Sequence, residues 1–346
     1  MNSSCPSVCI CIPTYNAEVT IKETLVSALA QDYPNFTIRI FDNASTDRTL
    51  EIIESFQDER ISIFRSDRNI GAIANFDRCI SVVEGTYTEM FHADEVYEPD
   101  MVSRQVVAME ARPEAGAAFT EAYLIDSASR VFGETTVAKY IGAERGTVAV
   151  RSYEELLPAI YRAGNFLLCS GALVRTKIYQ EEIVRWRGDM FSSSCDLDVW
   201  LRILEQHSVL FVLDKLMRTR TSRTQASYTE IKRNTARADM FLVLDHYLDK
   251  PRSQRALTAS DIAGYAAMQR MDRARRAMNL YLLGRKQEAV PLLNENLGFG
   301  IVSYAFRSKR GLLTLLLTVY LRSMIALGAD RLGKKLMQFA DQKVHR

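Results

Sequence analysis

Short apolar runs alternate with segments of helical periodicity along the first hundred residues, and this alternation restricts the fold more than any other feature. Four runs predict buried strands: 8–12, 37–41, 61–64 and 87–91. Three segments between them carry apolar side chains at helical spacing: 18–30, 47–56 and 72–83. Strands that alternate with helices predict a doubly wound, mainly parallel α/β sheet with a ligand site at the carboxyl ends of its strands.

The rest of the chain divides into a mixed part and a helical part. Four segments of the mixed part carry clear patterns: strands near 117–125 and 209–213, and helices near 153–161 and 196–206. From residue 228 onward we expect only helices, with connections near 250–253, Gly284 and 298–300. A pattern of leucines and small residues predicts a helical hairpin over 277–293. The predicted domains are 1–227, with halves 1–110 and 111–227, and a helical region 228–346 with a basic tail at 301–346.

Composition excludes several classes of protein. The 346 residues carry a net charge of only +2, which argues against a dedicated nucleic-acid binder. Neither GxGxxG nor GxxxxGK[ST] follows the first predicted strand, which argues against dinucleotide and P-loop enzymes. We see no signal peptide, and the longest apolar run, 311–321, is roughly half of the ~20 residues that a membrane-spanning helix needs. We therefore expect a cytoplasmic protein.

The cysteines predict buried thiols rather than a metal knuckle. Cys9 and Cys11 point to the same face of the first predicted strand, and no His or Cys follows at a spacing that would close a zinc site. We expect the cysteines to be small buried side chains in a reducing compartment. The six are Cys5, Cys9, Cys11, Cys79, Cys169 and Cys195.

Polar residues follow the ends of three predicted strands: Asn16, Asp42 and Asp94. This placement suits a binding crevice, and carboxylates gathered there favour a divalent cation that holds phosphates.

Two long stretches surround these residues, "SVCICIPTYNAEVTIKETLVSALAQDYPNFTIRIFDNASTDRTLEII" and "RNIGAIANFDRCI…GTYTEMFHADEVYEPDMV". With a further segment at 192–204, they resemble inverting glycosyltransferase family 2 of the bacterial surface-polysaccharide type. The resemblance covers residues 7–110 and 192–204. It implies a GT-A fold, a nucleoside-diphosphate-sugar donor, Mn²⁺ or Mg²⁺, and inversion at the anomeric carbon; the helical region 228–346 would be a C-terminal extension of that fold.

Within "IPTYN", Pro13 is expected to end the first strand. The resemblance then places one group of residues beside the nucleotide, with Glu18 close by: Pro13, Thr14, Tyr15 and Asn16. Asn16 could instead, or also, cap the following helix.

The segment "FDNASTD" provides Asp42 for the nucleotide, because a carboxylate can accept the N–H of a uracil or guanine edge. Ser45 and Asp47 are expected at the start of the next helix, as N-cap and first-turn acid. In "RNIGAIANF", Arg68 and Asn69 are expected to contact the donor, and Gly71 lets the backbone approach it. A turn glycine between solvated charges is the alternative.

"FHADE" stands where the family carries its acidic metal motif. Asp94 is the expected metal ligand, since hard cations prefer carboxylate oxygens. His92 occupies the first acidic position and could bind Mn²⁺ or hydrogen-bond the sugar or phosphate. Ala93 lies between them at the donor site, and Glu95 stands where another Asp is frequent. An acidic turn without a ligand is the alternative.

"SSSCDLDVWLRIL" resembles the segment that supplies the catalytic base. Asp196 aligns with the catalytic Asp and Cys195 replaces the usual Glu; Asp198 is the second choice. Asp196 could instead be an N-cap. Trp200 and Leu201 are expected in the core.

In "MRTRTSRTQAS", Arg220 stands where the family often has a His. We expect Arg220 at the donor, where it could neutralise the leaving diphosphate with Arg218 and Arg223; a basic surface turn is the alternative.

The expected enzyme transfers a sugar from a nucleoside diphosphate to a saccharide or lipid-linked saccharide hydroxyl. A sugar nucleotidyltransferase and an inactive scaffold in a polysaccharide-assembly complex are the alternatives. The tail 301–346 carries nine Lys or Arg and two Asp among apolar residues, which leaves a net charge of −5 on residues 1–300. It predicts either contact with an anionic membrane surface or packing, including a homodimer, through the C-terminal helices.

Overall fold

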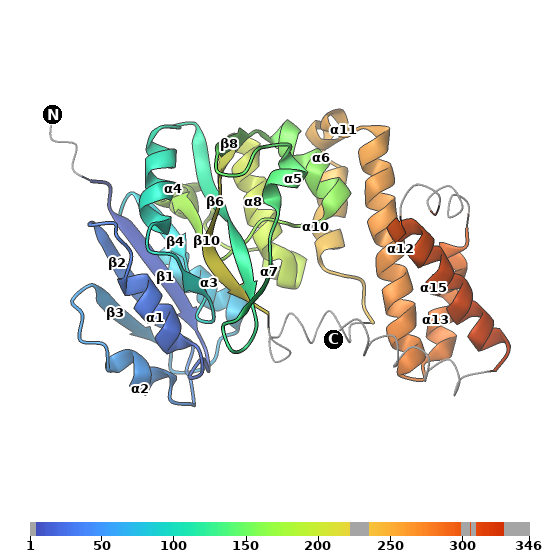
Figure 1. Ribbon diagram of the computed structural model, residues 1–346, viewed down its shortest axis with the longest axis horizontal. Coiled ribbons are helices and arrows are strands. Elements are labelled where there is room, and N and C mark those ends of the chain that lie inside the picture. Colours follow the sequence, from blue (N-terminus) through green and yellow to red (C-terminus); the bar gives the residue numbers. More distant parts are fainter. Residues whose placement is uncertain (1–4, 222–234, 299–304, 306–308, 329–346) are drawn as a thin grey trace.

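Ten strands form a single sheet in the computed structural model, which describes residues 5–221, 235–298, 305 and 309–328 (Figure 1). Its parallel part has the order β3-β2-β1-β4 and consists of β1 (Val8–Thr14), β2 (Phe36–Asp42), β3 (Ile61–Arg65) and β4 (Tyr87–Met90). The four strands predicted from the sequence are confirmed. Pro13 does not end β1, because the strand continues through Thr14, which pairs with Asp42. The ladder with β4 stops at Cys11, so the missing N–H of Pro13 breaks no bond on that side.

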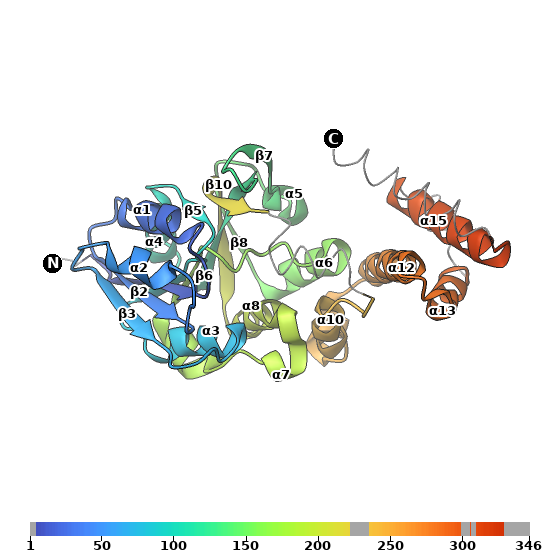
Figure 2. The same cartoon turned by 90° about the horizontal axis from the view of Figure 1, so that it is seen from below.

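Two hydrophobic cores lie on opposite faces of the sheet because successive side chains of a strand alternate. Ile10 and Ile12 belong to the core that α1 (Ile21–Leu29), α2 (Thr49–Glu54) and α4 (Met101–Glu110) cover. Cys9 and Cys11 belong to the other core, beneath α3 (Ala72–Ser81), and their sulfurs lie 3.8 Å apart. Figure 2 shows the two layers of helices with the sheet between them. The predicted burial of the thiols is confirmed for Cys9, Cys11, Cys79 and Cys195, whereas Cys169 is partly buried and the prediction is wrong for Cys5, which is exposed.

The second half of the sheet is mixed. Its two long strands are β6 (Ala115–Ile125) and β10 (Ser208–Arg220), which run parallel to each other. Antiparallel β9 (Ala172–Arg175) joins β4 to β6, and three short strands pair at the edges: β5 (Val96–Tyr97), β7 (Val131–Glu134) and β8 (Val148–Arg151). The helical elements of this half are α5 (Val137–Ile141), α6 (Tyr153–Ala163), the π-helix η1 (Ile178–Ile183), α7 (Gly188–Phe191), the 3-10 helix η2 (Ser192–Ser194) and α8 (Cys195–Gln206). Trp200 and Leu201 of α8 are fully buried, as predicted.

From residue 235 on, every described element is a helix. These helices are α10 (Met240–Leu248), α11 (Pro251–Ala256), α12 (Ala259–Leu282), α13 (Lys286–Asn296) and α15 (Lys309–Ala326). The predicted hairpin around Gly284 is confirmed, since α12 and α13 pack together on either side of that residue. The predicted connection near 250–253 is confirmed only at Lys250, between the end of α10 at Leu248 and the start of α11 at Pro251, whose missing N–H costs nothing at this helix position.

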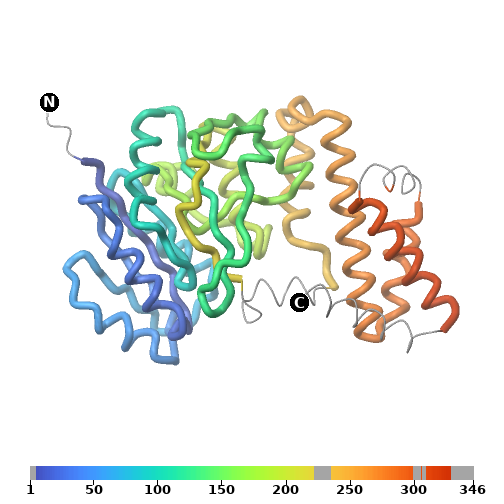
Figure 3. The backbone as a smooth tube through the Cα atoms, in the orientation of Figure 1, coloured from blue at the N-terminus to red at the C-terminus, as the bar shows by residue number. Residues whose placement is uncertain are grey.

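The C-terminal helices divide between two cores. Phe241, Leu244 and Tyr265 bury their side chains in the same core as α6 and α8. Farther along, Leu280, Leu293 and Leu321 form a separate cluster that joins α12, α13 and α15. Figure 3 shows these three helices, in orange and red, at the opposite end of the molecule from β1–β3, in blue. Among the described residues, no helix combines the length and the apolar character needed to cross a bilayer.

Candidate functional site

The carboxyl ends of β1 and β2 lie side by side and present a buried carboxylate. Thr14 and Asp42 are paired at the last position of their ladder. Asp42 is 1% exposed, and its Oδ2 accepts the Ser45 N–H at 3.1 Å. Its Oδ1 has no hydrogen-bond partner within the described structure. A buried oxygen without a donor is costly, so this atom suits a ligand N–H such as that of a base.

The loops after β1 and β2 are bonded to each other. Asn16 Oδ1 accepts the Thr46 N–H at 2.8 Å, and the Asn16 N–H donates to Ser45 Oγ at 3.0 Å. Glu18 Oε2 likewise accepts the Arg48 N–H at 3.0 Å. Asn16 therefore does not cap α1, which begins at Ile21 without a side-chain cap, and Ser45 does not cap α2.

Asp47, in contrast, acts at the helix start as predicted. Its Oδ1 accepts the N–H of Thr49, the first residue of α2, at 3.0 Å. Around these loops Tyr15 is 46% exposed, whereas Thr14 is buried. The two loops are thus joined by hydrogen bonds, and Tyr15 is exposed one residue after Thr14, the strand partner of Asp42.

Asn43, which the sequence analysis missed, fixes the loop before α3. Its Nδ2 donates to Asn69 Oδ1 at 2.9 Å, and its Oδ1 accepts the Ile70 N–H at 2.9 Å. Asn69 Oδ1 also accepts the Gly71 N–H, so Asn69 shapes this loop. Gly71 has φ +87°, and a Cβ there would meet no atom within 4 Å, so conformation rather than crowding requires glycine. Arg68 is exposed and forms no ion pair with any described residue.

The segment after β4 gathers three potential metal ligands. The ligand atoms of His92, Asp94 and Glu95 lie within 4.8 Å of one another, the one such group in the described part of the chain. His92 Nε2 is buried without a partner, and burial lowers the pKa of this ring despite the opposing effect of Asp94, so the imidazole is neutral near pH 7. Burial, and then the charge of Asp94, raise the pKa of Glu95 to about 8. One nitrogen and two carboxylates suit Mn²⁺ and accommodate Mg²⁺ less well.

Buried polar contacts hold this metal-ligand segment in place. The Tyr97 hydroxyl contacts the His92 N–H at 2.6 Å and the Ser170 hydroxyl at 2.6 Å. Thr20 Oγ1 donates to the carbonyl of Ala93 at 2.9 Å, which ties the start of α1 to the same segment. Neither Tyr97 nor Ser170 carries a signal in the sequence, because their role depends on a contact between segments that are far apart in the chain.

Arg220, at the end of β10, is 5% exposed and donates four hydrogen bonds to protein groups. Its acceptors are Asp94 O, Asp126 O, Ser129 Oγ and Glu23 Oε2. Arg218 pairs with Glu98 at 2.8 Å, and Arg223 lies outside the described residues. The alternative of a basic surface turn is wrong for Arg220, whose guanidinium braces the backbone of Asp94. Its contact with the donor stays a prediction.

The two carboxylates of α8 have different surroundings. Asp198 is fully buried and binds Arg187 and Arg202, at 2.6 and 3.0 Å, and the Tyr247 hydroxyl. Asp196 is partly exposed, and Asn165 Nδ2 donates to its Oδ2 at 3.2 Å. Burial raises the pKa of Asp196 to about 6, with the hydrogen bonds opposing. Asp196 is the second residue of α8, so the N-cap interpretation is wrong. Asp196 is free of ion pairs with the described residues, and Asp198 is not.

The segment 165–170 connects Asp196 to the metal-ligand segment. Asn165 contacts Asp196 at one end, and Ser170 contacts Tyr97 beside His92 at the other. Between them lies Cys169, whose pKa is raised mainly by burial and then by the charges of Asp196 and, more weakly, Glu95. The charges of both carboxylates thus act on the same thiol. The structure brings the sequence-predicted residues from β1, β2, β4 and α8 to one edge of the sheet.

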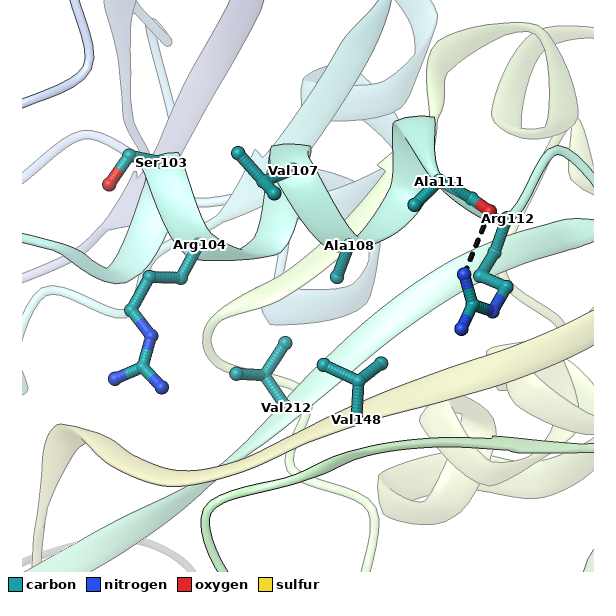
Figure 4. A pocket seen from close by; sticks show the side chains of 8 residues that line it. All are labelled: Ser103, Arg104, Val107, Ala108, Ala111, Arg112, Val148 and Val212. Carbon is teal, nitrogen blue, oxygen red and sulfur yellow. Dashed lines mark hydrogen bonds between the residues drawn. The ribbon is translucent and has the colours of Figure 1, made fainter.

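A pocket of about 430 Å³ lies elsewhere, between α4 and strands β8 and β10 (Figure 4). None of the residues predicted to bind donor, metal or acceptor lines it. Its lining consists of Ser103, Arg104, Val107, Ala108, Ala111, Arg112, Val148 and Val212.

Comparisons with known proteins bear on the family and the fold. The model of the family described as glycosyl transferase family 2 matches residues 9–181. A relative from Escherichia coli, UDP-Glc:alpha-D-GlcNAc-diphosphoundecaprenol beta-1,3-glucosyltransferase WfaP, is 34% identical over 103 residues, which are 30% of this chain and 41% of the relative.

Two solved structures share the fold over most of the chain. The first is Staphylococcus aureus TarS 1-349 in complex with UDP, with a TM-score of 0.60, 15% identity and coverage of 93% of this chain and 92% of that one. The second is the mannosyltransferase PcManGT of Pyrobaculum calidifontis in complex with GDP-Man and Mn²⁺, with a TM-score of 0.53, 14% identity and coverage of 98% and 88%.

Proposed function

The chain belongs to glycosyl transferase family 2 and is a glycosyltransferase, and on that premise we propose that it moves a sugar from a nucleoside diphosphate to a saccharide hydroxyl with inversion. The observation that supports this proposal is the segment 165–170, which is hydrogen-bonded to Asp196 at one end and, at the other, to His92 of the ligand group His92–Asp94–Glu95 and to Tyr97. We assign the donor to residues 1–110, the acceptor to residues 111–227, and a supporting role to the helices beyond.

The donor nucleotide is assigned to the loops after β1 and β2. Asp42 Oδ1, buried and without a donor, accepts a base N–H, and Tyr15 offers an exposed ring in the loop after β1. Asn16 and Glu18 hold these two loops together through hydrogen bonds. Asn43 and Asn69 shape the neighbouring loop before α3, which contains Gly71. The unpaired Arg68 is placed to neutralise charge on the nucleotide. Uracil and guanine both present an N–H that Asp42 can accept.

The diphosphate is assigned to the metal-ligand segment. Asp94 and His92 would hold Mn²⁺ or Mg²⁺, and the His92 Nε2 without a partner is the observation that fits this ion. A bound cation would neutralise the negative charge of the departing nucleoside diphosphate. Arg220 braces the Asp94 backbone, so that the carboxylate is held in position before the donor arrives.

Asp196 is assigned as the general base. Inversion requires an acceptor hydroxyl that attacks from the face opposite the diphosphate and loses its proton to a nearby base. Asn165 donates a hydrogen bond from Nδ2 to Asp196 Oδ2, and Asn165 Oδ1 accepts the Leu167 N–H at 3.1 Å. The second bond orients the Asn165 amide so that its NH₂ group faces the carboxylate. Asp198 forms ion pairs with Arg187 and Arg202, so it is unsuited to proton transfer.

The acceptor is proposed to be a saccharide, free or lipid-linked, and the enzyme to work at the cytoplasmic face of a membrane. The similarity to a relative named for a diphosphoundecaprenol-linked acceptor supports this class of substrate. The helix α15 contributes exposed Leu312, Leu313 and Leu316 beside Lys309 and Arg310, and contains no acidic residue. An apolar face next to basic residues favours contact with anionic lipid over self-association of two basic surfaces.

An assay of product release tests the proposal. The full chain is incubated with UDP- and GDP-sugars, with and without Mn²⁺, and the released phosphates are identified. Metal-dependent release of nucleoside diphosphate is the expected result. Pyrophosphate chemistry would indicate a nucleotidyltransferase, and no reaction together with no thermal stabilisation by any donor would indicate a scaffold.

A further inference from the structure

Two aromatic rings stack at Phe166, the residue that follows the Asn165 in contact with Asp196. Phe166 follows Asn165 directly in the chain, and Asn165 donates a hydrogen bond to Asp196. The ring of Phe166 stacks on that of Tyr140 from α5, with centroids 5.1 Å apart and an interplanar angle of 25°. Tyr140 is 38% exposed, and Phe166 is partly buried against the core. One ring is thus held by packing and the other offers area to solvent.

The position of Tyr140 on α5 argues against a purely structural role. The helix packs through Val137, Ala138 and Ile141, which are buried, whereas Tyr140 lies outside that set. The first turn is anchored by Glu121, a buried carboxylate that accepts the Ala138 N–H at 3.0 Å and pairs with Lys215. The stacked pair therefore rests on a rigid support, as a preformed binding surface requires.

The direction of the segment 165–170 indicates which substrate meets these rings. Its Ser170 end contacts the residues around His92, where the donor diphosphate is assigned. Its Asn165–Phe166 end contacts Asp196, the proposed base, which must lie against the attacking hydroxyl. The rings therefore lie on the acceptor side of the base.

We propose that Tyr140 and Phe166 form a stacking platform for a pyranose ring of the saccharide acceptor. One face of a pyranose presents C–H bonds, which pack against the negative face of an aromatic ring, while its hydroxyls remain free for polar contacts. The exposed amide of Asn165 supplies such a polar group next to the platform. This assignment rests on the proposed glycosyl transfer and adds the surface that holds the acceptor.

Binding and kinetics of octyl glycosides of glucose, galactose and N-acetylglucosamine test the platform in the full-length protein, with nucleoside diphosphate and Mn²⁺ present. Saturation-transfer NMR identifies which protons of the glycoside contact the protein. We expect the strongest transfer at the ring C–H protons, and a loss of at least five-fold in acceptor affinity in Tyr140→Ala. Tyr140→Phe keeps the ring and should bind within two-fold of the parent. Val107→Ala, an exposed apolar truncation on the opposite face, is the matched control.

Donor hydrolysis without acceptor separates this proposal from the proposed function, because Tyr140→Ala should leave it unchanged. Equal glycoside binding by the parent and Tyr140→Ala, transfer mainly at the octyl chain, or no binding of any glycoside by the parent would each overturn the platform. Loss of donor hydrolysis in Tyr140→Ala would also overturn it, since that result places the ring at the donor.

Discussion

The surroundings of a side chain decide its role, as two carboxylates that lie two residues apart on α8 show. The sequence favours Asp196 over Asp198 only through the family pattern, since both precede the same apolar run. The structure separates them physically: Asp198 neutralises two arginines inside the core, and Asp196 faces Asn165 and solvent. Asn165 could not be identified from the sequence, because its contact with Asp196 joins residues 31 positions apart.

Replacing each carboxylate in turn should give opposite results. Asp196→Asn should keep the melting temperature and donor binding but lower turnover by about 10²-fold or more, the scale for losing a positioned base. Asp198→Asn should lower the free energy of unfolding by about 3–5 kcal/mol, because Asp198 is fully buried and its loss leaves two partly buried arginines without their partner. Calorimetry and steady-state kinetics measure both. Loss of turnover in a fully folded Asp198→Asn, with Asp196→Asn active, would show that the base is misassigned.

The pH dependence of kcat/KM reports on Asp196 directly. A base must be ionised, and burial raises the pKa of Asp196 to about 6, so activity should fall as the pH falls through about 6. Asn165→Ala removes a hydrogen bond that favours the ionised form, and it should move this limb to higher pH. A purely structural role for Asn165 would lower activity equally at all pH values. A limb that stays in place in Asn165→Ala would contradict the positioning role.

At the scale of elements, residues 8–91 could be predicted because each strand and helix there carries its own periodicity, whereas β5 and α4, which follow, were not predicted. The strands β7, β8 and β9, with four residues each, were not predicted, since such short segments show no period and exist through pairing with β4, β6 or β10. The stacked pair Tyr140–Phe166 was missed for the same reason, because α5 has only five residues.

Within β4, Glu89 is fully buried and neither of its oxygens has a hydrogen-bond partner in the described structure. Burial raises its pKa well above the ordinary 4.5, so the folded protein holds a proton that the unfolded chain releases. The folded state is therefore penalised increasingly as the pH rises above about 4.5 toward the raised pKa. Glu89→Gln cannot titrate, so its melting temperature relative to the parent should increase between pH 5 and pH 8.

Glu121→Gln is the matched control, because Glu121 is equally buried but pairs with Lys215. Breaking that pair should destabilise the protein at neutral pH. A difference between Glu89→Gln and the parent that does not change with pH would show that Glu89 is not a buried neutral acid.

At the scale of the whole molecule, the basic tail divides into a part that packs and a part outside the described residues. Leu321 is buried, and Met324 and Ile325 pack on the cluster of α12 and α13, which supports the packing alternative for these side chains. The apolar and basic residues of the tail beyond residue 328, among them Arg331, Lys334, Leu336 and Lys343, lie outside the described residues. The exposed leucines of α15 do not pack on this cluster and are available to contact a partner.

Sedimentation with vesicles tests the membrane contact. Leu313→Glu with Leu316→Glu adds charges at positions that are 64% and 55% exposed, so the fold should not change. The parent should bind anionic vesicles, with affinity that falls with salt, because each nearby basic residue adds about 1 kcal/mol. The double variant should bind less. Val107→Glu, 70% exposed on α4, is the control. Equal binding by all three proteins would exclude α15 as the contact.

The most direct test of the assigned centre is the metal dependence of donor binding. Thermal shift is measured for the parent and Asp94→Ala with UDP- and GDP-sugars, with and without Mn²⁺. A native-state ligand raises apparent stability by about 2.7 kcal/mol at a hundred-fold excess over its Kd, so the readout is sensitive. We expect Mn²⁺ to increase stabilisation by the donor in the parent, and Asp94→Ala to abolish that increase. Unchanged metal-dependent stabilisation in Asp94→Ala would contradict a metal-assisted donor site at the end of β4.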